Sequence, residues 1–295
     1  MTEPAVPTDP PPIEGVRRSY VSARGVRFHV TESGTGMPVV VLHGWPEHHY
    51  CYRDLLADPP KGLRIIAPDL PGYGWSGAAP HRWEKQDVAD DLLALLDALA
   101  LERVLLVGHD WGAFIGYLLV LGAPQRFGGL MALSVPHPWN TPRALLPHMW
   151  RLGHMPLMAV AGRPLVQNTR VLEQVIFRLG VGQRDAISPQ DVRWYADRFR
   201  DPVCAQVTTD TYRTFVLREV PAAARHPERR RATVPIRALH GTADFAVHRT
   251  LVSADTVIAD DYSVELLAGC GHFIPEERPD RVRAQLVGLA EQNPV

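Results

Sequence analysis

Apolar runs and helical patterns alternate along most of the chain. Continuous apolar stretches predict strands buried on both faces, and one alternating stretch predicts a further strand. The continuous runs are 37–44, 63–74 (ending in a glycine-rich loop), 103–108, 128–136, 235–241 and 262–272, and the alternating run is 26–33. Residues 85–100 and 112–124 have apolar positions at helical spacing. Short strands that alternate with helices predict an α/β fold, with a mostly parallel sheet covered by helices on both faces.

The alternation of strands and helices stops between about residues 138 and 232. This stretch contains helical patterns and no convincing buried strand; Ser188 followed by proline, for example, is typical of a helix N-terminus. We therefore expect an inserted helical cap at 138–232 and a core made of residues 16–137 and 233–295. Residues 1–15 are rich in proline and are expected to form a flexible tail.

Composition narrows the classes of function. The chain of 295 residues is 46% hydrophobic, enough for one large core, and its net charge of -1 argues against a nucleic-acid partner. Its three cysteines are widely spaced and show no metal-ligand or disulfide pattern, so we expect no metal and no other cofactor. There is no apolar run of about 18 residues and no signal-peptide pattern, so we expect a cytoplasmic protein without a membrane segment. The sequence leaves a homodimer open.

Three residues with chemical potential follow predicted strands. Asp110 lies between Gly108 and Gly112, at the point where an apolar strand turns tightly into a helix. Asp244 and His272 each follow a later strand, and the carboxyl ends of parallel strands gather at one edge of a sheet. Each residue also has a simpler interpretation: Asp110 as a helix cap, Asp244 as a turn residue, and His272 as a core histidine.

Taken together, these motifs resemble one enzyme family. The residues that carry the resemblance are His43-Gly44-Trp45-Pro46, the loop 69–77, Gly108-His109-Asp110-Trp111-Gly112, Asp244 and Gly271-His272. They are similar to the α/β-hydrolase-fold epoxide hydrolases, the branch in which aspartate replaces the nucleophilic serine. The resemblance covers the chain after its tail, and implies an α/β-hydrolase fold with a helical cap.

The resemblance also implies a mechanism and a substrate class. Asp110 would attack an epoxide and form an ester, and His272, oriented by Asp244, would activate the water that hydrolyses this ester to a vicinal diol. The backbone N–H groups of Trp45 and Trp111 would form the oxyanion hole. The expected partners are therefore a small epoxide and water.

Members of this family use two cap tyrosines to donate to the epoxide oxygen. Tyr212 matches the second, but the region expected to hold the first, residues 149–162, has no tyrosine. His154 is the predicted substitute, as an imidazole or an imidazolium, and Tyr195 is a second choice whose aromatic neighbours favour a core position. Tyr212 as an ordinary helix residue and His154 as an uninvolved cap residue are the alternatives.

Aromatic residues near these motifs complete the predicted site. We expect the side chains of Trp45, Trp111 and Phe245 to bind substrate.

Three other functions remain as alternatives. A haloalkane dehalogenase would share Asp110, His272 and Trp111, although Tyr212 favours an epoxide, because an alkoxide needs a proton and a halide does not. A fluoroacetate dehalogenase would suit a histidine near position 154, but it needs arginines beside the nucleophile, where this chain has Trp111 and Phe114. A non-catalytic receptor on the same scaffold would not need the three predicted catalytic residues.

Overall fold

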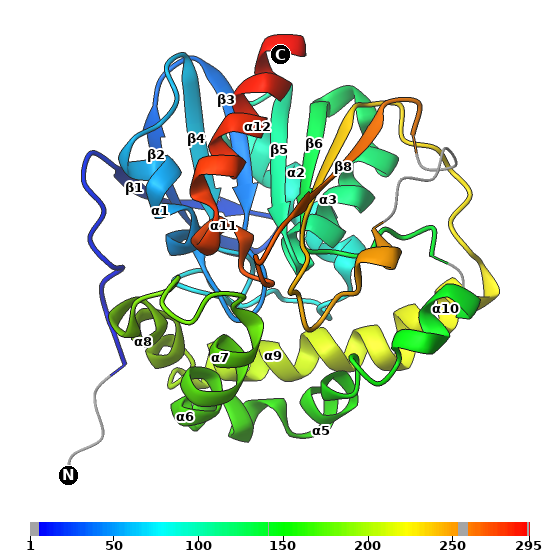
Figure 1. Ribbon diagram of the computed structural model, residues 1–295. Helices are drawn as coiled ribbons and strands as arrows, with labels where there is room; N and C mark the ends of the chain where they lie inside the picture. Colours follow the sequence, from blue (N-terminus) through cyan, green and yellow to red (C-terminus); the bar gives the residue numbers. More distant parts are fainter. Residues whose placement is uncertain (1–5, 141, 253–258, 294) are drawn as a thin grey trace.

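An eight-stranded sheet forms the centre of the protein in the computed structural model, which describes residues 6–140, 142–252, 259–293 and 295 (Figure 1). The strand order is β1-β2-β4-β3-β5-β6-β7-β8, and all pairs are parallel from β4 onward. The strands are β1 (Arg17–Ala23), β2 (Val26–Gly34), β3 (Met37–Leu42), β4 (Leu63–Pro68), β5 (Val104–His109), β6 (Phe127–Leu133), β7 (Ile236–Gly241) and β8 (Tyr262–Leu267). The predicted α/β fold with a mostly parallel sheet is confirmed.

The sequence pattern did not predict the antiparallel edge strand β1. Its residues include Arg17, Arg18 and Ser19, and its burial pattern is mostly exposed or intermediate. Arg17 lies directly opposite Glu32 of β2 and forms an ion pair with it at 2.6 Å. A strand held by backbone pairing and cross-strand charges shows little of the apolar signal that marks a buried strand.

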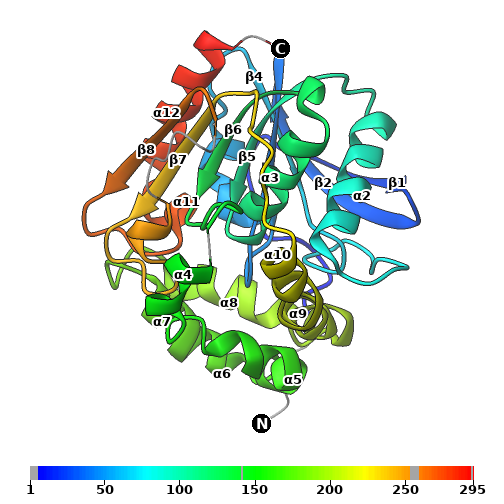
Figure 2. The same cartoon turned by 90° about the vertical axis from the view of Figure 1, so that its right-hand side faces the viewer.

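Helices cover both faces of the sheet (Figures 1 and 2). One face carries α2 (Lys85–Ala98) and α3 (Trp111–Gly122), and the other carries α1 (Arg53–Ala57), α11 (Ile274–Glu277) and α12 (Pro279–Gln292). Short 3-10 helices lie at η1 (His49–Tyr52), η2 (Pro124–Arg126) and η6 (Arg249–Leu251). Every residue of β5 and β6 is buried, as expected for strands between two helical layers. Within the described residues, no helix has the length and apolar character that crossing a bilayer requires.

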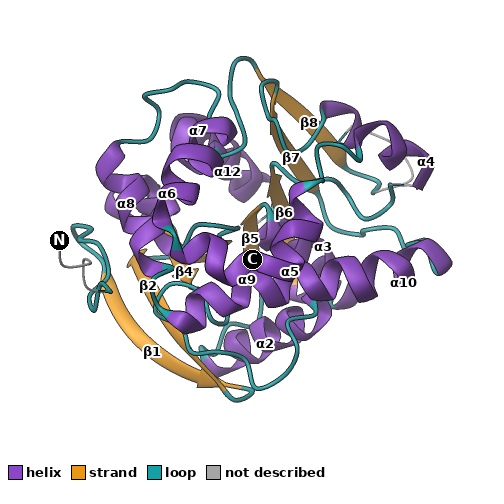
Figure 3. Cartoon of the chain, turned by 90° about the horizontal axis from the view of Figure 1, so that it is seen from below, coloured by secondary structure: helices purple, strands orange, loops and turns teal. Residues whose placement is uncertain are grey.

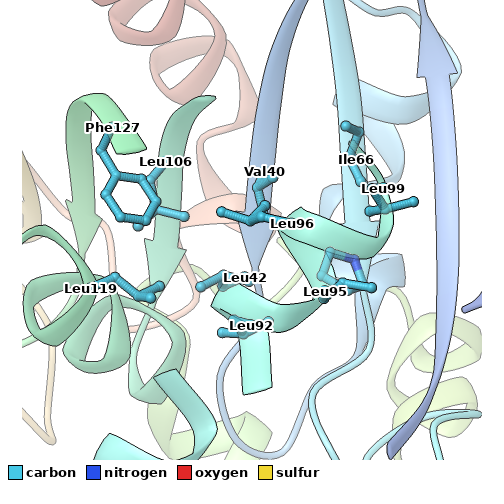
Figure 4. A pocket seen from close by; sticks show the side chains of 11 residues that line it. Val40, Leu42, Ile66, Leu92, Leu95, Leu96, Leu99, Leu106, Leu119 and Phe127 are labelled. Atoms are coloured by element: carbon cyan, nitrogen blue, oxygen red, sulfur yellow. The ribbon is translucent and has the colours of Figure 1, made fainter. Parts of the chain in front are cut away.

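The contact between α2 and the sheet shows how tightly this core is packed. Leucines of α2 meet apolar side chains of the central strands around a void of only about 10 Å³ (Figure 4). The lining residues are Val40, Leu42, Ile66, Pro68, Leu92, Leu95, Leu96, Leu99, Leu106, Leu119 and Phe127. A space of this size is at the lower limit for one water molecule, so this region is structural core.

Between β6 and β7 the described residues form helices joined by loops, with one isolated bridge at Ala232, and we call these helices the cap. They are α4 (Pro142–Leu145), η3 (Leu146–His148), α5 (His154–Gln167), α6 (Thr169–Val171), η4 (Leu172–Ile176), α7 (Phe177–Gly180), α8 (Pro189–Arg198), α9 (Pro202–Thr214), η5 (Phe215–Glu219) and α10 (Val220–Arg225). Ser188 accepts a hydrogen bond from the N–H of Asp191 at the start of α8, as its sequence indicates. Most cap helices lie beyond the carboxyl ends of the central strands (Figures 1 and 3). The domain boundaries at 137/138 and 232/233 stay a prediction.

The N-terminal segment contacts the body of the protein. Its described residues 6–13 form neither helix nor strand. The carbonyl of Pro7 accepts a hydrogen bond from Arg198, and that of Thr8 accepts one from the Trp75 indole. These contacts place the segment beside the cap helix α8.

Candidate active site

Asp110 occupies a strained turn between β5 and α3. Its φ of 49° lies in the left-handed region, which non-glycine residues rarely adopt. A Cβ at Gly112 would lie 2.4 Å from the carbonyl oxygens of Leu42 and His43, and a Cβ at Gly108 would lie 2.5 Å from the Cα of Ala113. Close backbone approach therefore excludes larger residues on both sides of Asp110, as the sequence predicts.

The Asp110 carboxylate points away from the helix that it precedes. It makes no capping hydrogen bond to α3, although it stands at the N-cap position. Its Oδ2 instead accepts a hydrogen bond from the backbone N–H of Trp45 at 3.0 Å. Gly44 makes this contact possible, because a Cβ there would lie 2.4 Å from the Cβ of Asp110. The helix-cap interpretation of Asp110 therefore does not describe its side chain.

His272 lies between the other two predicted catalytic residues. Its Nδ1 is 2.9 Å from Oδ2 of Asp244, and its Nε2 is 3.8 Å from Oδ1 of Asp110. The other oxygen of Asp244 accepts the N–H groups of Ala246 and Val247 at 2.8 and 2.9 Å. The structure therefore brings together three side chains that are far apart in the sequence, in the order expected for a nucleophile, a histidine and an orienting acid.

Burial and charge act in opposite directions on this trio. Burial lowers the pKa of His272, but Asp244 and Asp110 together raise it to about 9. Burial raises the pKa of Asp244, but the charge and hydrogen bond of His272 bring it below its usual value. The imidazolium between two carboxylates is thus the favoured state of the resting site at neutral pH.

A buried pair behind His272 was not singled out from the sequence. His109 Nε2 donates to the backbone carbonyl of His272 at 2.9 Å, and His109 Nδ1 lies 2.8 Å from a carboxylate oxygen of Glu47. Both side chains are fully buried. Glu47 directly follows the His43-Gly44-Trp45-Pro46 motif, so its position next to that motif was the available signal. The pair links the loop after β3 to the loop that carries His272.

Tyr212 lies in the cap helix α9, packed against both predicted oxyanion-hole residues, Trp45 and Trp111. Its ring meets Trp45 at 5.5 Å and Trp111 at 5.6 Å, in edge-on arrangements. The residue is 2% exposed. Burial, and next to it the charge of Asp110, raises the pKa of Tyr212 well above its usual value. The phenol is therefore protonated in the resting protein and can act as a proton donor.

His154 lies next to Tyr212 but has a constrained hydrogen-bonding role. Its ring is 5.8 Å from that of Tyr212, and its Nδ1 is 3.2 Å from the carbonyl of Arg151. Burial lowers the pKa of His154, although Asp110 opposes this. Since a carbonyl can only accept, a neutral His154 places its one N–H on Arg151. The predicted donation from His154 to an epoxide oxygen therefore requires the imidazolium.

Two other predicted site residues, Tyr195 and Phe245, differ in burial and contacts. Tyr195 is fully buried, donates to a carboxylate oxygen of Glu276 and stacks on Phe177, so it is a core residue. Phe245 is 44% exposed and its ring contacts Trp150 at 5.9 Å. Its role in substrate binding stays a prediction.

One buried group among the described residues has the composition of a metal site. His29 and His49 place their Nδ1 atoms 2.8 and 2.9 Å from the two oxygens of Asp69, which also accepts the N–H of Trp75. These are hydrogen-bond distances, and a carboxylate shared in this way fixes the glycine-rich loop after β4. We assign the group a structural role.

The chain belongs to the α/β-hydrolase fold family, which matches it over residues 37–279. The AB hydrolase superfamily protein YfhM of Bacillus subtilis (strain 168) is 27% identical over 285 residues, which cover 90% of this chain and 95% of that protein. A solved structure of an epoxide hydrolase from Vigna radiata has a TM-score of 0.78 at 22% identity, covering 95% of this chain and 100% of that one, and shows the same fold.

Higher identity is confined to a shorter stretch. Epoxide hydrolase 3 of Siraitia grosvenorii is 40% identical over 126 residues, which cover 42% of this chain. That stretch spans 40% of the relative's own length. Epoxide hydrolase A of Mycobacterium tuberculosis is 42% identical over 135 residues, again 40% of its length.

Proposed function

We propose that this protein is an epoxide hydrolase that converts an epoxide to a vicinal diol through an ester on Asp110. The observation that carries the proposal is the position of the Asp110 carboxylate. It receives the N–H of Trp45, lies 3.8 Å from His272, and is close enough to Tyr212 for its charge to raise the phenol's pKa. Relatives named as epoxide hydrolases support it.

In the first step, an oxygen of Asp110 forms a bond to an epoxide carbon while the bond between that carbon and the epoxide oxygen breaks. The electron pair of the broken bond stays on the oxygen, which takes a proton from Tyr212. Nucleophile and donor lie on opposite sides of the bound epoxide, since Asp110 belongs to the core and Tyr212 to the cap. Formation of the ester removes the negative charge that had raised the pKa of Tyr212, so the proton becomes easier to release as the reaction advances.

In the second step, water attacks the carbonyl carbon of the Asp110 ester. His272 accepts a proton from this water, and Asp244 stabilises the resulting imidazolium. The negative charge of the tetrahedral intermediate develops on the oxygen that faces the N–H of Trp45, with the N–H of Trp111 as the second donor. Such a donor typically stabilises the transition state by about 3 kcal/mol. Collapse of the intermediate breaks the ester bond, and the departing diol oxygen takes the proton held by His272. The second proton of the water, carried by the Asp110 carboxyl, replaces the one that Tyr212 gave up in the first step, which restores both the carboxylate and the phenol.

Haloalkane dehalogenation is the second candidate, favoured by one observation. Trp111 Nε1 is buried and makes no hydrogen bond of good geometry to a described residue, as a donor to a departing halide would require. The indole does interact with the Tyr212 phenol, where it lowers the phenol's pKa against the larger effect of burial. Trp45 does not offer a second indole donor, because its Nε1 donates to Thr208 at 3.1 Å. Bromoalkanes tested beside epoxides separate the two activities, and turnover of neither class would favour a receptor.

The proposed ester can be tested by single-turnover hydrolysis of styrene oxide in water enriched in oxygen-18. We expect one heavy oxygen in the tryptic peptide 104–126, in which Asp110 is the sole acidic side chain, and an unlabelled diol. The label enters the peptide because water attacks the ester carbonyl and not the substrate. His272→Gln protein, treated identically, should retain an unlabelled peptide. Label in the diol and none in the peptide would show direct attack by water.

The pH dependence of ester hydrolysis follows from the environment of His272. In the resting protein its pKa is raised to about 9, partly by the Asp110 charge. Ester formation removes that charge, so the pKa in the intermediate is lower, and hydrolysis speeds up as pH rises through this lower value. Rapid quenching with intact-mass detection should show a rate that increases from about pH 6 and levels off below about pH 9. A pH-independent rate over this range would remove His272 as the base. The His272→Gln protein should show no such plateau.

A further inference from the structure

Lys85 is a buried cation beside the proposed active site. It is one of only two lysines in the chain, and its residue is 0% exposed. As the first residue of α2 it belongs to the core, but its Nζ donates to the carbonyl of Thr211 in the cap at 2.6 Å. The same Nζ lies 2.7 Å from a carboxylate oxygen of Glu219, also in the cap.

The ammonium of Lys85 also lies against aromatic rings. It is 4.6 Å from the ring centroid of Trp111, 5.1 Å from that of Phe215 and 5.7 Å from that of Trp83. A cation in such a position is attracted to the negative face of the ring, and more strongly when water is excluded. Trp111 directly follows Asp110, and its backbone N–H is the second proposed oxyanion-hole donor. The ammonium therefore contacts the side chain of a residue whose backbone takes part in the proposed reaction.

Glu219 joins the two halves of the molecule at this point. One of its oxygens accepts the backbone N–H of Lys85 at 2.6 Å, while the other pairs with the Lys85 ammonium. Glu219 therefore takes over the capping of α2, whose own N-cap residue, Glu84, makes no side-chain capping bond. Besides Glu219, the charged groups that act on the ammonium are Glu84 and Asp110.

Net stability is a weak explanation for this arrangement. Burial lowers the pKa of Lys85 to about 8, against the opposing effect of Glu219, which shows the cost of removing the ammonium from water. A buried ion pair often adds no net stability over apolar residues of the same size. The arrangement does fix the position of two helices relative to each other, because one ammonium contacts Trp111 of α3 and Thr211 of α9.

We propose that Lys85 is a positioning residue, whose ammonium holds the Trp111 indole and the Thr211 carbonyl in place so that Trp111 and Tyr212 both face Asp110. Thr211 immediately precedes Tyr212, and the Tyr212 ring packs edge-on against Trp111. Fixing the carbonyl of Thr211 therefore fixes the backbone that carries the phenol. Within the cap, the Thr211 carbonyl also accepts the N–H of Phe215 and the hydroxyl of Thr214. The ammonium adds a contact between this carbonyl and the core.

This inference rests on the proposed epoxide hydrolysis and predicts a specific kinetic effect. Loss of the ammonium leaves the pocket in place but lets Tyr212 and Trp111 shift. A displacement of about 1 Å can slow a reaction by about 10²-fold. The maximum rate of ester formation should therefore fall, while the substrate concentration for half-maximal rate should change little.

The test uses Lys85→Met, with Lys61→Met as the matched control because Lys61 is the exposed second lysine. Both changes are made in the His272→Gln protein, in which the ester accumulates, and its formation from styrene oxide is followed at pH 7 by rapid quenching and intact mass. We expect Lys85→Met to slow ester formation at saturation by about 10²-fold, Lys85→Arg to recover part of that loss, and Lys61→Met to have no effect. The inference is overturned if Lys85→Met leaves the maximum rate of ester formation unchanged. It is also overturned if only the substrate concentration for half-maximal rate changes.

Two further measurements keep the inference testable if Lys85→Met does not fold. Glu219→Gln keeps an acceptor for the α2 amide but removes the charge that holds the ammonium, and should slow ester formation about tenfold; a rate equal to that of the parent overturns the inference. Lysine labelled with carbon-13 at Cε should give two sets of signals, with the Lys85 protons shifted upfield by the neighbouring rings. Unshifted signals contradict the contact with Trp111. Failure of the His272→Gln parent to form any ester would instead overturn the proposed function itself.

Discussion

Replacing His272 by glutamine is expected to trap the protein as an ester on Asp110 and to lower steady-state turnover by about 10²–10⁴-fold. Attack by Asp110 needs only its carboxylate and a proton donor on the leaving oxygen, and neither is His272. Hydrolysis needs a base next to the ester, and the ring nitrogen 3.8 Å from Asp110 is the base that the structure offers. Intact-mass spectrometry after mixing with styrene oxide should show the protein plus one substrate.

The prediction of a trapped ester has a matched control variant and an outcome that would contradict it. His226 is exposed, lies between the cap and β7, and has no part in the proposed reaction, so His226→Gln should turn over normally and accumulate no adduct. Peptide mapping should place the added mass on residues 104–126. An His272→Gln protein that consumes epoxide slowly without an adduct would mean that water attacks the substrate directly.

The charge of Asp110 connects the two halves of the proposed reaction. While it is present, it raises the pKa of both Tyr212 and His272, so that the phenol keeps its proton and the imidazole holds one. Forming the ester removes that charge. Tyr212 then becomes a better acid, as ring opening requires, and His272 becomes able to lose its proton, as ester hydrolysis requires.

Much of the fold and the central trio could be predicted from the sequence, for a physical reason. The buried strands are continuous apolar runs, and Asp110, Asp244 and His272 each follow one of them, so their proximity follows from the parallel arrangement. The glycines around Asp110 reflect close backbone contacts within a few residues of the turn or with the neighbouring strand. Local sequence patterns therefore indicate which residues follow a buried strand and where the backbone must pass close to a neighbour.

The buried charged residues Lys85 and Glu47 could not be predicted from local sequence patterns. Lys85 begins a helix whose pattern is that of an ordinary amphipathic helix, and its burial results from cap residues more than a hundred positions later. Glu47 is likewise buried by its contact with His109. Neither residue differs in its local sequence from an exposed charged residue, so periodicity assigns both to the surface.

Tyr212→Phe is expected to slow ester formation from styrene oxide by about 10²–10⁴-fold, the usual contribution of a positioned acid. The substitution keeps the ring that packs against Trp45 and Trp111, and removes only the hydroxyl. Without it, the breaking carbon–oxygen bond produces an alkoxide in a buried site with no proton from the phenol. Single-turnover rates in the His272→Gln protein measure this step directly.

The same substitution distinguishes the two candidate reactions. A departing bromide needs no proton, so any ester formation from a bromoalkane should be nearly unaffected by Tyr212→Phe. Tyr20→Phe provides the matched control, because Tyr20 lies on the exposed face of β1 and is 45% exposed. Equal rates of ester formation from styrene oxide in Tyr212→Phe and its parent would exclude the phenol as the acid. The role would then pass to an imidazolium at His154, and ester formation should slow as pH rises above the pKa of that group.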